Sequence, residues 1–308
     1  MQVARSIEDL RLVSAAPLSV TIGNFDGVHL GHAAVLSELV TSAARAGTQP
    51  AAVTFEPHPL SVLGSMDRPF VLTPAAEKAD LMAAAGVAAL LVLEFDRALA
   101  EASATQFLAD LGIGPGAHLV LGYDFRMGHG RETDLAALSR LASEQRFALH
   151  VVPPIMHAGA RISSSRIRQA LWRGDTGDAA AMLGRPYRLE GQVVRGDGLG
   201  ARLGYPTANL SLSPEKLLPA DGVYVASVCG ERRLPGLLYV GRRPTMGRGE
   251  RRAEVHVLDG PGVPYGAPLA VDVLERLRCE MAFEGTGDLA EQIGRDVEAA
   301  RKLRRLRD

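Results

Sequence analysis

The chain is poor in cysteine and in lysine. Its 308 residues include only Cys229 and Cys279, too few for a disulfide framework or a C-x-x-C metal site, so we expect a cytoplasmic protein. Lysine occurs only at Lys78, Lys216 and Lys302, and no G-x-x-x-x-G-K-[ST] phosphate loop is present. Any phosphate site must therefore use arginines, helix N-termini or a metal ion.

Long apolar runs and an excess of one charge are missing too. The longest apolar runs, such as residues 87–93, are much shorter than a membrane span, and the N-terminus lacks an apolar signal core. The formal net charge of −1 gives no general attraction to nucleic acid or to anionic membranes. We expect neither kind of partner, and we expect a monomer or a weak oligomer.

Short apolar runs alternate with helical patterns from the N-terminus to residue 183. Runs that are apolar on both faces are typical of parallel strands covered by helices. The runs lie at 18–22, 51–55, 88–95, 118–121 and 148–152, and the helical patterns lie near 32–46, 74–85, 103–111 and 132–145. The sequence therefore predicts an α/β domain with a parallel sheet over residues 1–183.

The pattern changes after residue 183 to period-two runs separated by turn glycines. Strands at this spacing with no helices between them indicate a small antiparallel β-barrel. The runs lie at 187–194, 222–229, 234–240, 253–258 and 269–277. We predict a barrel domain over residues 184–308 that ends in a helix from about Asp288 to Leu306.

The most informative motif joins the first long apolar run to a helix, and reads L-S-V-T-I-G-N-F-D-G-V-H-L-G-H over residues 18–32. His29 and His32 are three residues apart, so both imidazoles lie on one face of the first helical turn. Backbone N–H groups at a helix start attract anions, and Gly23 and Gly31 allow a ligand to approach closely. The motif predicts a polyphosphate site; the alternative is a turn with two half-exposed histidines.

Two further motifs follow predicted strands. F-E-P-H-P places Pro57, His58 and Pro59 after the second run as a rigid wall that suits a planar ring, and G-Y-D-F-R-M-G places Asp124 after the fourth. Ligands of parallel sheets bind beyond the carboxyl ends of the strands, so we expect these residues near the histidines. A stiff exit from a strand would also explain the prolines.

The segment R-I-S-S-S-R-I-R, residues 161–168, leads three hydroxyls into a helix whose first turn carries arginine. An acid would be favoured there, so Arg166 and Arg168 indicate a bound anion. Ser164 is a candidate ligand of the same anion, although a helix cap would also explain one serine. Together with H-x-G-H, this segment resembles the nucleotidyltransferases that bond the α-phosphate of ATP to an acceptor and release pyrophosphate.

The second half carries its own candidate residues. Thr207 and Asn209 of P-T-A-N lie on one side of an extended backbone and supply hard oxygen ligands suited to Mg²⁺. Glu254 of A-E-V-H-V-L shares a strand face with His256 and is a candidate general base. The alternatives are an ordinary turn and a solvated strand glutamate. The preceding glycines superficially mimic a dinucleotide fingerprint, but no βαβ unit follows them.

Seven motifs in order across both halves closely resemble the family of bacterial bifunctional riboflavin kinase/FMN adenylyltransferases, over residues 18–300. They read G-N-F-D-G-V-H-L-G-H, F-E-P-H-P, G-Y-D-F-R-M-G, S-S-S-R-I-R, G-Y-P-T-A-N, L-P-A-D-G-V-Y and R-P-T-M-G…A-E-V-H-V-L-D. The resemblance implies a Rossmann-like nucleotidyltransferase domain followed by a riboflavin kinase barrel. ATP and Mg²⁺ would convert riboflavin to FMN in the barrel, and ATP would convert FMN to FAD and pyrophosphate in the first domain.

The resemblance also implies roles for individual residues. His29, His32 and Arg166 would act on the ATP phosphates, Ser164 and Arg168 would steady the triphosphate, Thr207 and Asn209 would hold Mg²⁺, and Glu254 would be the kinase base. The nucleotide and flavin sites would be lined by Gly23, Phe25, Asp26, Gly31, Pro57, His58, Pro59, Asp124, Gly198, Gly200 and Gly204.

Some positions depart from the family pattern: Thr133, Ser165, Arg195, Ala201 with Arg202, Arg242 and Met246. They concern loop conformation and substrate affinity more than the chemistry. Two other interpretations stay open. One keeps a single activity, with the other domain as a flavin or nucleotide binder. The other is a nucleic-acid-binding protein that uses the basic tail 301–307, although basic residues also suit a helix C-terminus.

Overall fold

The computed structural model describes residues 1–13, 18–64, 68–230, 232–242, 251–258, 260 and 262–305. The chain forms two compact units, Met1–Ser164 and Ser165–Asp308. Helices α8 (Ser164–Arg173) and α9 (Thr176–Leu183) are grouped with the second unit. Their links to it include a 2.8 Å hydrogen bond from the Thr176 hydroxyl to the Leu274 carbonyl. The sequence pattern assigned both helices to the first domain, and the boundary at 183/184 stays a prediction.

The first unit is built on a parallel sheet with the strand order β1-β4-β3-β2-β5-β6. The strands are β1 (Gln2–Ala4), β2 (Leu18–Ile22), β3 (Gln49–Glu56), β4 (Ala89–Glu94), β5 (His118–Gly122) and β6 (Ala148–Val152). This confirms the α/β prediction, to which the structure adds β1. Because β3, β2 and β5 are neighbours, the residues that follow them meet at one edge of the sheet.

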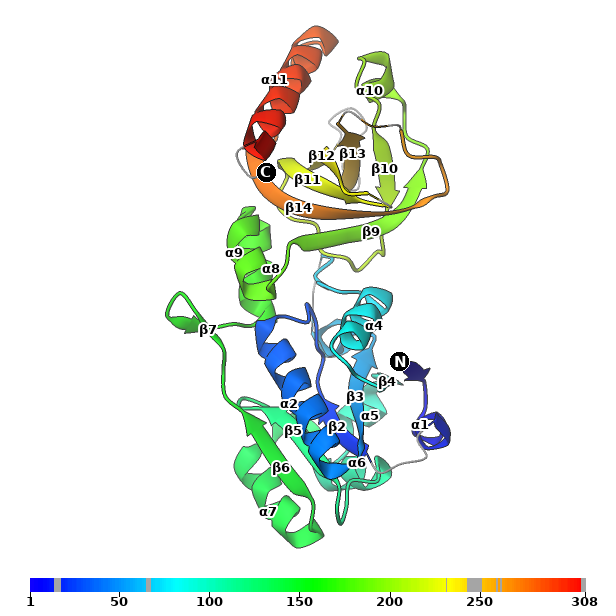
Figure 1. Cartoon of the computed structure of the whole chain (residues 1–308), viewed down its shortest axis with the longest axis vertical. Helices are drawn as coiled ribbons and strands as arrows, with labels where there is room; N and C mark the ends of the chain where they lie inside the picture. Colours follow the sequence, from blue (N-terminus) through cyan, green and yellow to red (C-terminus); the bar gives the residue numbers. More distant parts are fainter. Residues whose placement is uncertain are drawn as a thin grey trace. The chain divides into compact units, whose positions relative to one another are not determined.

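Helices cover both faces of this sheet (Figure 1). Leu36 and Leu39 of α2 pack with Met82 of α4 against one face, whereas Leu108 of α6 and Leu138 of α7 pack against the other. The helices of the unit are α1 (Ile7–Val13), α2 (Leu30–Ala46), α3 (Pro59–Leu63), α4 (Ala75–Ala84), α5 (Arg97–Glu101), α6 (Ala104–Asp110) and α7 (Leu135–Gln145), with a 3₁₀ turn at His129–Arg131.

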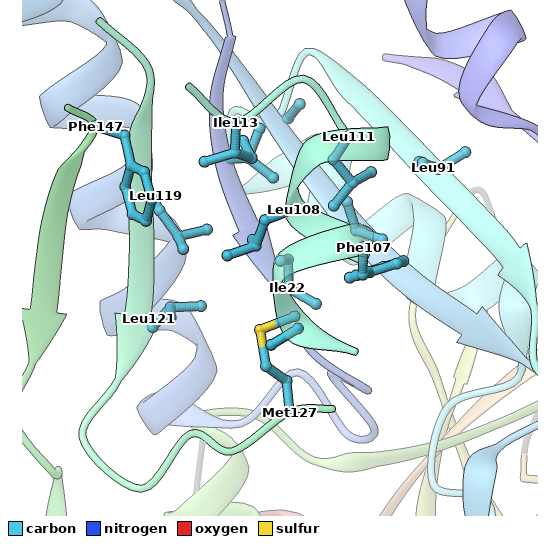
Figure 2. Packing of buried hydrophobic residues seen from close by; sticks show 14 of the residues in the cluster. Ile22, Leu91, Phe107, Leu108, Leu111, Ile113, Leu119, Leu121, Met127 and Phe147 are labelled. Carbon is cyan, nitrogen blue, oxygen red and sulfur yellow. The ribbon is translucent and has the colours of Figure 1, made fainter. Parts of the chain in front are cut away.

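The core on the α6 side is closely packed. Figure 2 shows Leu108 among Ile22 of β2 and Leu119 and Leu121 of β5, and all four side chains are almost completely buried. Burial of each such aliphatic side chain is worth about 1.5–3 kcal/mol. This packing fixes the central strands whose ends carry the candidate residues. A two-stranded hairpin of β7 (Met156–His157) and β8 (Ala160–Arg161) precedes α8.

The second unit contains a closed antiparallel barrel with the order β10-β13-β12-β11-β14-β9, as predicted. Its strands are β9 (Tyr187–Val194), β10 (Ala208–Ser211), β11 (Gly222–Cys229), β12 (Leu234–Gly241), β13 (Arg252–Val257) and β14 (Pro268–Cys279). A short helix, α10 (Leu199–Arg202), interrupts the connection between β9 and β10.

The C-terminal helix α11 (Thr286–Arg305) packs on the barrel through Val297 and Ala300. It is further held by Asp296, which is almost buried and pairs with Arg278 of β14 at 2.8 Å. The predicted helix end at Leu306 lies outside the described residues. No helix in the described part of the chain is both long and apolar enough to cross a membrane.

Candidate active sites

Asp26 holds the turn between β2 and α2 to the segment that precedes α4. Its buried carboxylate accepts hydrogen bonds from the backbone N–H of Leu72, at 2.9 Å, and of Thr73, at 3.0 Å. The Thr73 hydroxyl in turn accepts a bond from the N–H of Gly27 at 2.9 Å. The Asp26 side chain therefore holds the shape of the turn, and its predicted contact with nucleotide stays a prediction. Phe25 is also buried, with its ring against Gly23.

We expect Asp26→Ala to lower the free energy of unfolding by about 3 kcal/mol, because a buried charged acceptor is lost and its backbone donors are left unsatisfied. The amides of Leu72 and Thr73 should exchange with solvent faster, which hydrogen-exchange mass spectrometry measures. Asp80→Ala, at an exposed position of α4, is the matched control and should stay within about 0.5 kcal/mol of the parent. Unchanged exchange in the Asp26 variant would contradict this role.

His29 and His32 form a stacked pair at the start of α2. Their ring centroids are 3.6 Å apart with planes 12° apart, and Nδ1 of His29 caps the helix by accepting the N–H of His32 at 3.2 Å. An added Cβ at Gly31 would come within 3.1 Å of the His29 ring, so glycine makes room for the stack. Nδ1 of His32 is buried and has no hydrogen-bond partner among the described residues, which leaves a polar atom that a ligand or water can satisfy.

Burial, together with the neighbouring His29 and Lys78, lowers the pKa of His32 well below its usual value of 6.5. Desolvation is the largest of these causes, because it disfavours the charged imidazolium. His32 is therefore neutral at pH 7 and acts as a hydrogen-bonding group rather than as a cation.

This lowered pKa has a testable consequence for stability. Below pH 6.5 the His32 imidazole is protonated in the unfolded chain, whereas in the folded chain it stays neutral until the pH is much lower. His32 therefore lowers the free energy of unfolding as the pH falls below that value, and it has no effect above it. An NMR titration should show that the His32 imidazole is still neutral well below pH 6.5. A midpoint at or above the ordinary value would contradict the buried, stacked arrangement.

The ends of β3 and β5 carry the next candidates. His58 is buried, caps α3 by accepting the N–H of Leu60 at 3.1 Å, and packs edge-on against Phe70. Pro57 precedes it and Pro59 begins α3, and the contact of this segment with a planar ring stays a prediction. Asp124 follows β5 and pairs with Arg161 of the hairpin, a partner that the sequence reasoning did not assign.

Ser164 links the serine-rich segment to the first motif, because its hydroxyl donates to the Asp26 carbonyl at 2.8 Å. The structure thus brings Ser164 to the same turn as the histidines. Arg166 and Arg168 follow in α8, which is grouped with the second unit, and Arg168 is almost buried. Their contact with a triphosphate stays a prediction.

Lys78 is a buried lysine linked to the turn between β2 and α2, and it was not identified from the sequence. Lys78 of α4 is 7% exposed, and its ammonium donates to the Thr54 hydroxyl at 3.1 Å. That hydroxyl donates to the Asn24 carbonyl at 3.1 Å, so the lysine supports the turn through β3. Lysine is rarely buried unless it is paired, and its scarcity in this chain is the only signal that singles it out.

In the barrel, the candidate residues gather where β10 meets β13. Asn209 lies directly opposite Glu254 in the strand register, and the Thr207 hydroxyl donates to Glu254 Oε2 at 3.2 Å. Asn209 is almost buried, and its Oδ1 has no hydrogen-bond partner in the part of the chain that the structure describes. A hydroxyl, an amide oxygen and a carboxylate therefore lie on neighbouring residues of β13 and the start of β10, and their binding of Mg²⁺ stays a prediction. No cluster of three His, Cys, Asp or Glu side chains that could hold a metal occurs within the described ranges.

The glycine-rich connection before Thr207 wraps closely around these residues. A Cβ at Gly196 would lie 2.3 Å from Nδ2 of Asn209, and one at Gly200 would lie 2.4 Å from the Tyr205 carbonyl oxygen. Gly198 and Gly204 take positive φ angles of 67° and 86°. The close contacts and the positive φ angles of this connection therefore depend on glycine. Its contact with nucleotide stays a prediction.

Where the structure describes them, the residues that depart from the family pattern lie in helices, in loops and at a strand end. Thr133 forms an isolated β-bridge, the Arg195 guanidinium lies 5.5 Å from the centre of an exposed tyrosine ring, and Ala201 belongs to α10. Arg242 follows the end of β12. Met246, with the R-P-T-M-G motif around it, lies outside the described residues.

Comparison with known proteins assigns the two halves to families. Residues 13–166 match the family model of FAD synthetase, and residues 183–304 match that of riboflavin kinase. The chain is 36% identical over 310 residues to the bifunctional riboflavin kinase/FMN adenylyltransferase of Escherichia coli K12, which covers 98% of each chain. It is also 36% identical to the protein of the same name from Bacillus subtilis, over 91% of this chain and 90% of that one.

The fold also matches a crystal structure described as a macrolide-efflux protein from Streptococcus pneumoniae. The TM-score is 0.84 and the identity 29%, over 97% of this chain and 98% of the other. The words "macrolide-efflux" describe that protein and are not applied to this chain. The structural similarity extends over both units. Because both family models match in order and the full-length relatives are 36% identical, the chain belongs to the family of bifunctional riboflavin kinase/FMN adenylyltransferases.

Proposed function

We propose that this chain makes FAD from riboflavin in two steps, one at each site. The barrel transfers the γ-phosphate of ATP to the 5′-hydroxyl of riboflavin, and the first unit joins FMN to the adenylyl group of a second ATP with release of pyrophosphate. The observation that carries the proposal is the meeting of Thr207, Asn209 and Glu254 at β10 and β13, in the half matched by riboflavin kinases. The stacked histidines supply the second site, in the half matched by FAD synthetases.

In the kinase step, Glu254 accepts the proton of the riboflavin hydroxyl as its oxygen attacks the γ-phosphorus. The bond from that phosphorus to the bridging oxygen breaks, and ADP leaves. Thr207 and Asn209 would hold Mg²⁺, which fits the unpartnered Oδ1 of Asn209 and the hydroxyl beside it. When bound, the ion would neutralise charge on the phosphates. Positioning and charge stabilisation then supply most of the rate enhancement.

In the adenylyl step, a phosphate oxygen of FMN attacks the α-phosphorus of ATP and pyrophosphate leaves. The N–H groups at the start of α2, with His29 and His32, bind the phosphates as negative charge moves toward the leaving group. Arg166, Arg168 and Ser164 steady the triphosphate. His58, Pro57 and Pro59 with Asp124 border the nucleotide and flavin.

Labelled ATP tests this division. Label at the γ-position should enter FMN and remain in the FMN half of FAD, whereas label at the α-position should enter only FAD. The controls are reactions without flavin and with FMN supplied in place of riboflavin. Entry of the α-label into FMN, or failure of both labels to reach flavin, would overturn the assignment.

The metal part of the proposal has a test of its own. Gly196→Ala should displace Asn209, because the added methyl group would overlap its amide. We expect phosphorylation to fall by about 10²-fold, as for ligands misplaced by 1 Å, and more Mg²⁺ to be needed for half-maximal rate. Gly262→Ala is the control, since a Cβ there would have no described atom within 4 Å. An unchanged Mg²⁺ requirement would argue against Asn209 as a ligand.

The expected setting follows from this chemistry. We infer a cytoplasmic enzyme whose partners are the small molecules riboflavin, FMN and ATP rather than nucleic acid or membranes. Cys229 and Cys279 are both free thiols, which supports a reducing compartment. A monomer or weak oligomer stays the expectation.

A further inference from the structure

His256 makes a second link across the kinase site, and the mechanism above does not use it. It lies two residues beyond Glu254 on β13, so both side chains leave the strand on the same face. Its Nδ1 is 2.8 Å from the carbonyl oxygen of Pro206, the residue before Thr207. A carbonyl only accepts, so Nδ1 carries the proton and donates it.

The imidazole is itself held by Tyr205. The two rings meet edge to face, with centroids 5.7 Å apart and planes at 84°. The Tyr205 ring packs with the cluster that joins the barrel to α11, and its hydroxyl lies against Gly294 of that helix. A Cβ at Gly294 would lie 3.0 Å from this hydroxyl, so an alanine there would require the Tyr205 hydroxyl to move by a few tenths of an ångström.

These contacts fix the backbone immediately before the candidate metal ligands. The peptide that joins Pro206 to Thr207 is held at its carbonyl by His256, while the Thr207 hydroxyl is held by Glu254. The next residues enter β10, where Asn209 lies opposite Glu254. If the Pro206 carbonyl were released, that peptide would be free to rotate and the Thr207 hydroxyl would lose its direction toward the carboxylate.

We propose that His256 is a positioning residue for riboflavin phosphorylation: by donating to the Pro206 carbonyl it holds Thr207 against Glu254, with Tyr205 and Gly294 of α11 fixing its orientation. This proposal rests on the kinase function proposed above. His256 takes no proton from substrate in this role, because its donor serves the backbone.

The test compares His256→Leu, which removes the donor, with His256→Asn, whose side-chain amide can donate to the same carbonyl. Each full-length variant is assayed for kcat and KM with riboflavin, for the Mg²⁺ concentration at half-maximal rate, and for adenylylation of supplied FMN. We expect His256→Leu to lower kcat for phosphorylation about tenfold, the effect of one lost hydrogen bond, and to raise the Mg²⁺ requirement. His256→Asn should restore most of both, and adenylylation should be unchanged in both variants.

Gly294→Ala disturbs the contact between α11 and Tyr205, and so tests the orientation of His256 without changing His256 itself. This variant tests the proposal if His256→Leu unfolds the barrel. Gly294→Ala should lower kcat for phosphorylation and raise the Mg²⁺ requirement. Gly287→Ala, in the same helix, should change neither, because its added Cβ would have no described atom within 4 Å. Wild-type kcat and Mg²⁺ requirement in both His256→Leu and Gly294→Ala would overturn the proposal. Loss of one limb of the pH–rate profile in His256→Asn would also overturn it, by making His256 an acid or base. If the unmodified chain forms no FMN, the kinase function itself fails, which is a separate result.

Discussion

Glu254→Gln should lower the rate of riboflavin phosphorylation by roughly 10² to 10⁴, the usual contribution of a general base. Glutamine keeps the size of the side chain and can still accept the hydrogen bond that Thr207 donates at 3.2 Å, so the local packing should survive. What is lost is the carboxylate that takes the proton from the attacking hydroxyl. Initial rates of FMN formation from riboflavin and ATP measure the effect.

The second activity of the same chain serves as the control for Glu254→Gln. Adenylylation of supplied FMN should be nearly unchanged, because the stacked histidines belong to the first unit and Glu254 to the second. An equal loss of both activities would indicate a general defect rather than a lost base. A phosphorylation rate within twofold of the parent would remove Glu254 from the mechanism.

His32→Ala should have the opposite effect, so that FMN accumulates from riboflavin and ATP while FAD formation falls by roughly 10² to 10³, the usual cost of removing one transition-state hydrogen-bond donor. The substitution removes a neutral imidazole whose Nδ1 has no hydrogen-bond partner within the described ranges. It also removes one ring of the stack with His29. Chromatography that separates riboflavin, FMN and FAD gives both rates from one reaction.

Arg166→Ala provides a second variant with the same expected pattern, since Arg166 is proposed to bind the same triphosphate from α8. The kinase rate of either variant reports whether the barrel is intact. If FAD still forms at the parental rate in His32→Ala and in Arg166→Ala, the assignment of adenylylation to this motif is wrong.

The strands were predictable where apolar residues follow one another on both faces. Leu18–Ile22 and His118–Gly122 begin and end within a residue of the expected runs, because a strand buried on both sides leaves a continuous apolar signal. Gln2–Ala4 was not recognised, since three residues at a sheet edge carry no periodicity. The short α3 was overlooked as well, although a capping side chain before Pro59 is typical of a helix start.

Some residues of the candidate sites could be predicted from the sequence, and others could not. The pairs His29 with His32 and Thr207 with Asn209 could be predicted from spacing, because each pair lies within four residues at the start of a helix or a strand. The bond from Lys78 to Thr54 joins α4 to β3, and the bonds from Asp26 join the turn to the segment before α4. Sequence spacing carries no signal for such long-range partners. The backbone hydrogen bonds that the Asp26 carboxylate accepts could therefore not be predicted, and its contact with nucleotide stays a prediction.

Helices α8 and α9 are grouped with the second unit, and the domain boundary expected at 183/184 stays a prediction. Helical periodicity places a helix but does not say which core it will join. Here a cross-link from Thr176 to the Leu274 carbonyl, and one from the Ala220 amide to the Leu171 carbonyl at 2.8 Å, tie both helices to the second unit. Residue types alone could not have shown either partner.

The central claim is that one chain carries both activities, and a chromatographic time course of the purified protein with riboflavin, ATP and Mg²⁺ tests it most directly. The account predicts that FMN appears first and FAD follows, with one pyrophosphate released for each FAD. FMN without FAD would confine catalysis to the barrel. Formation of neither product, with oxidised or dithionite-reduced flavin and with FMN supplied directly, would contradict the account.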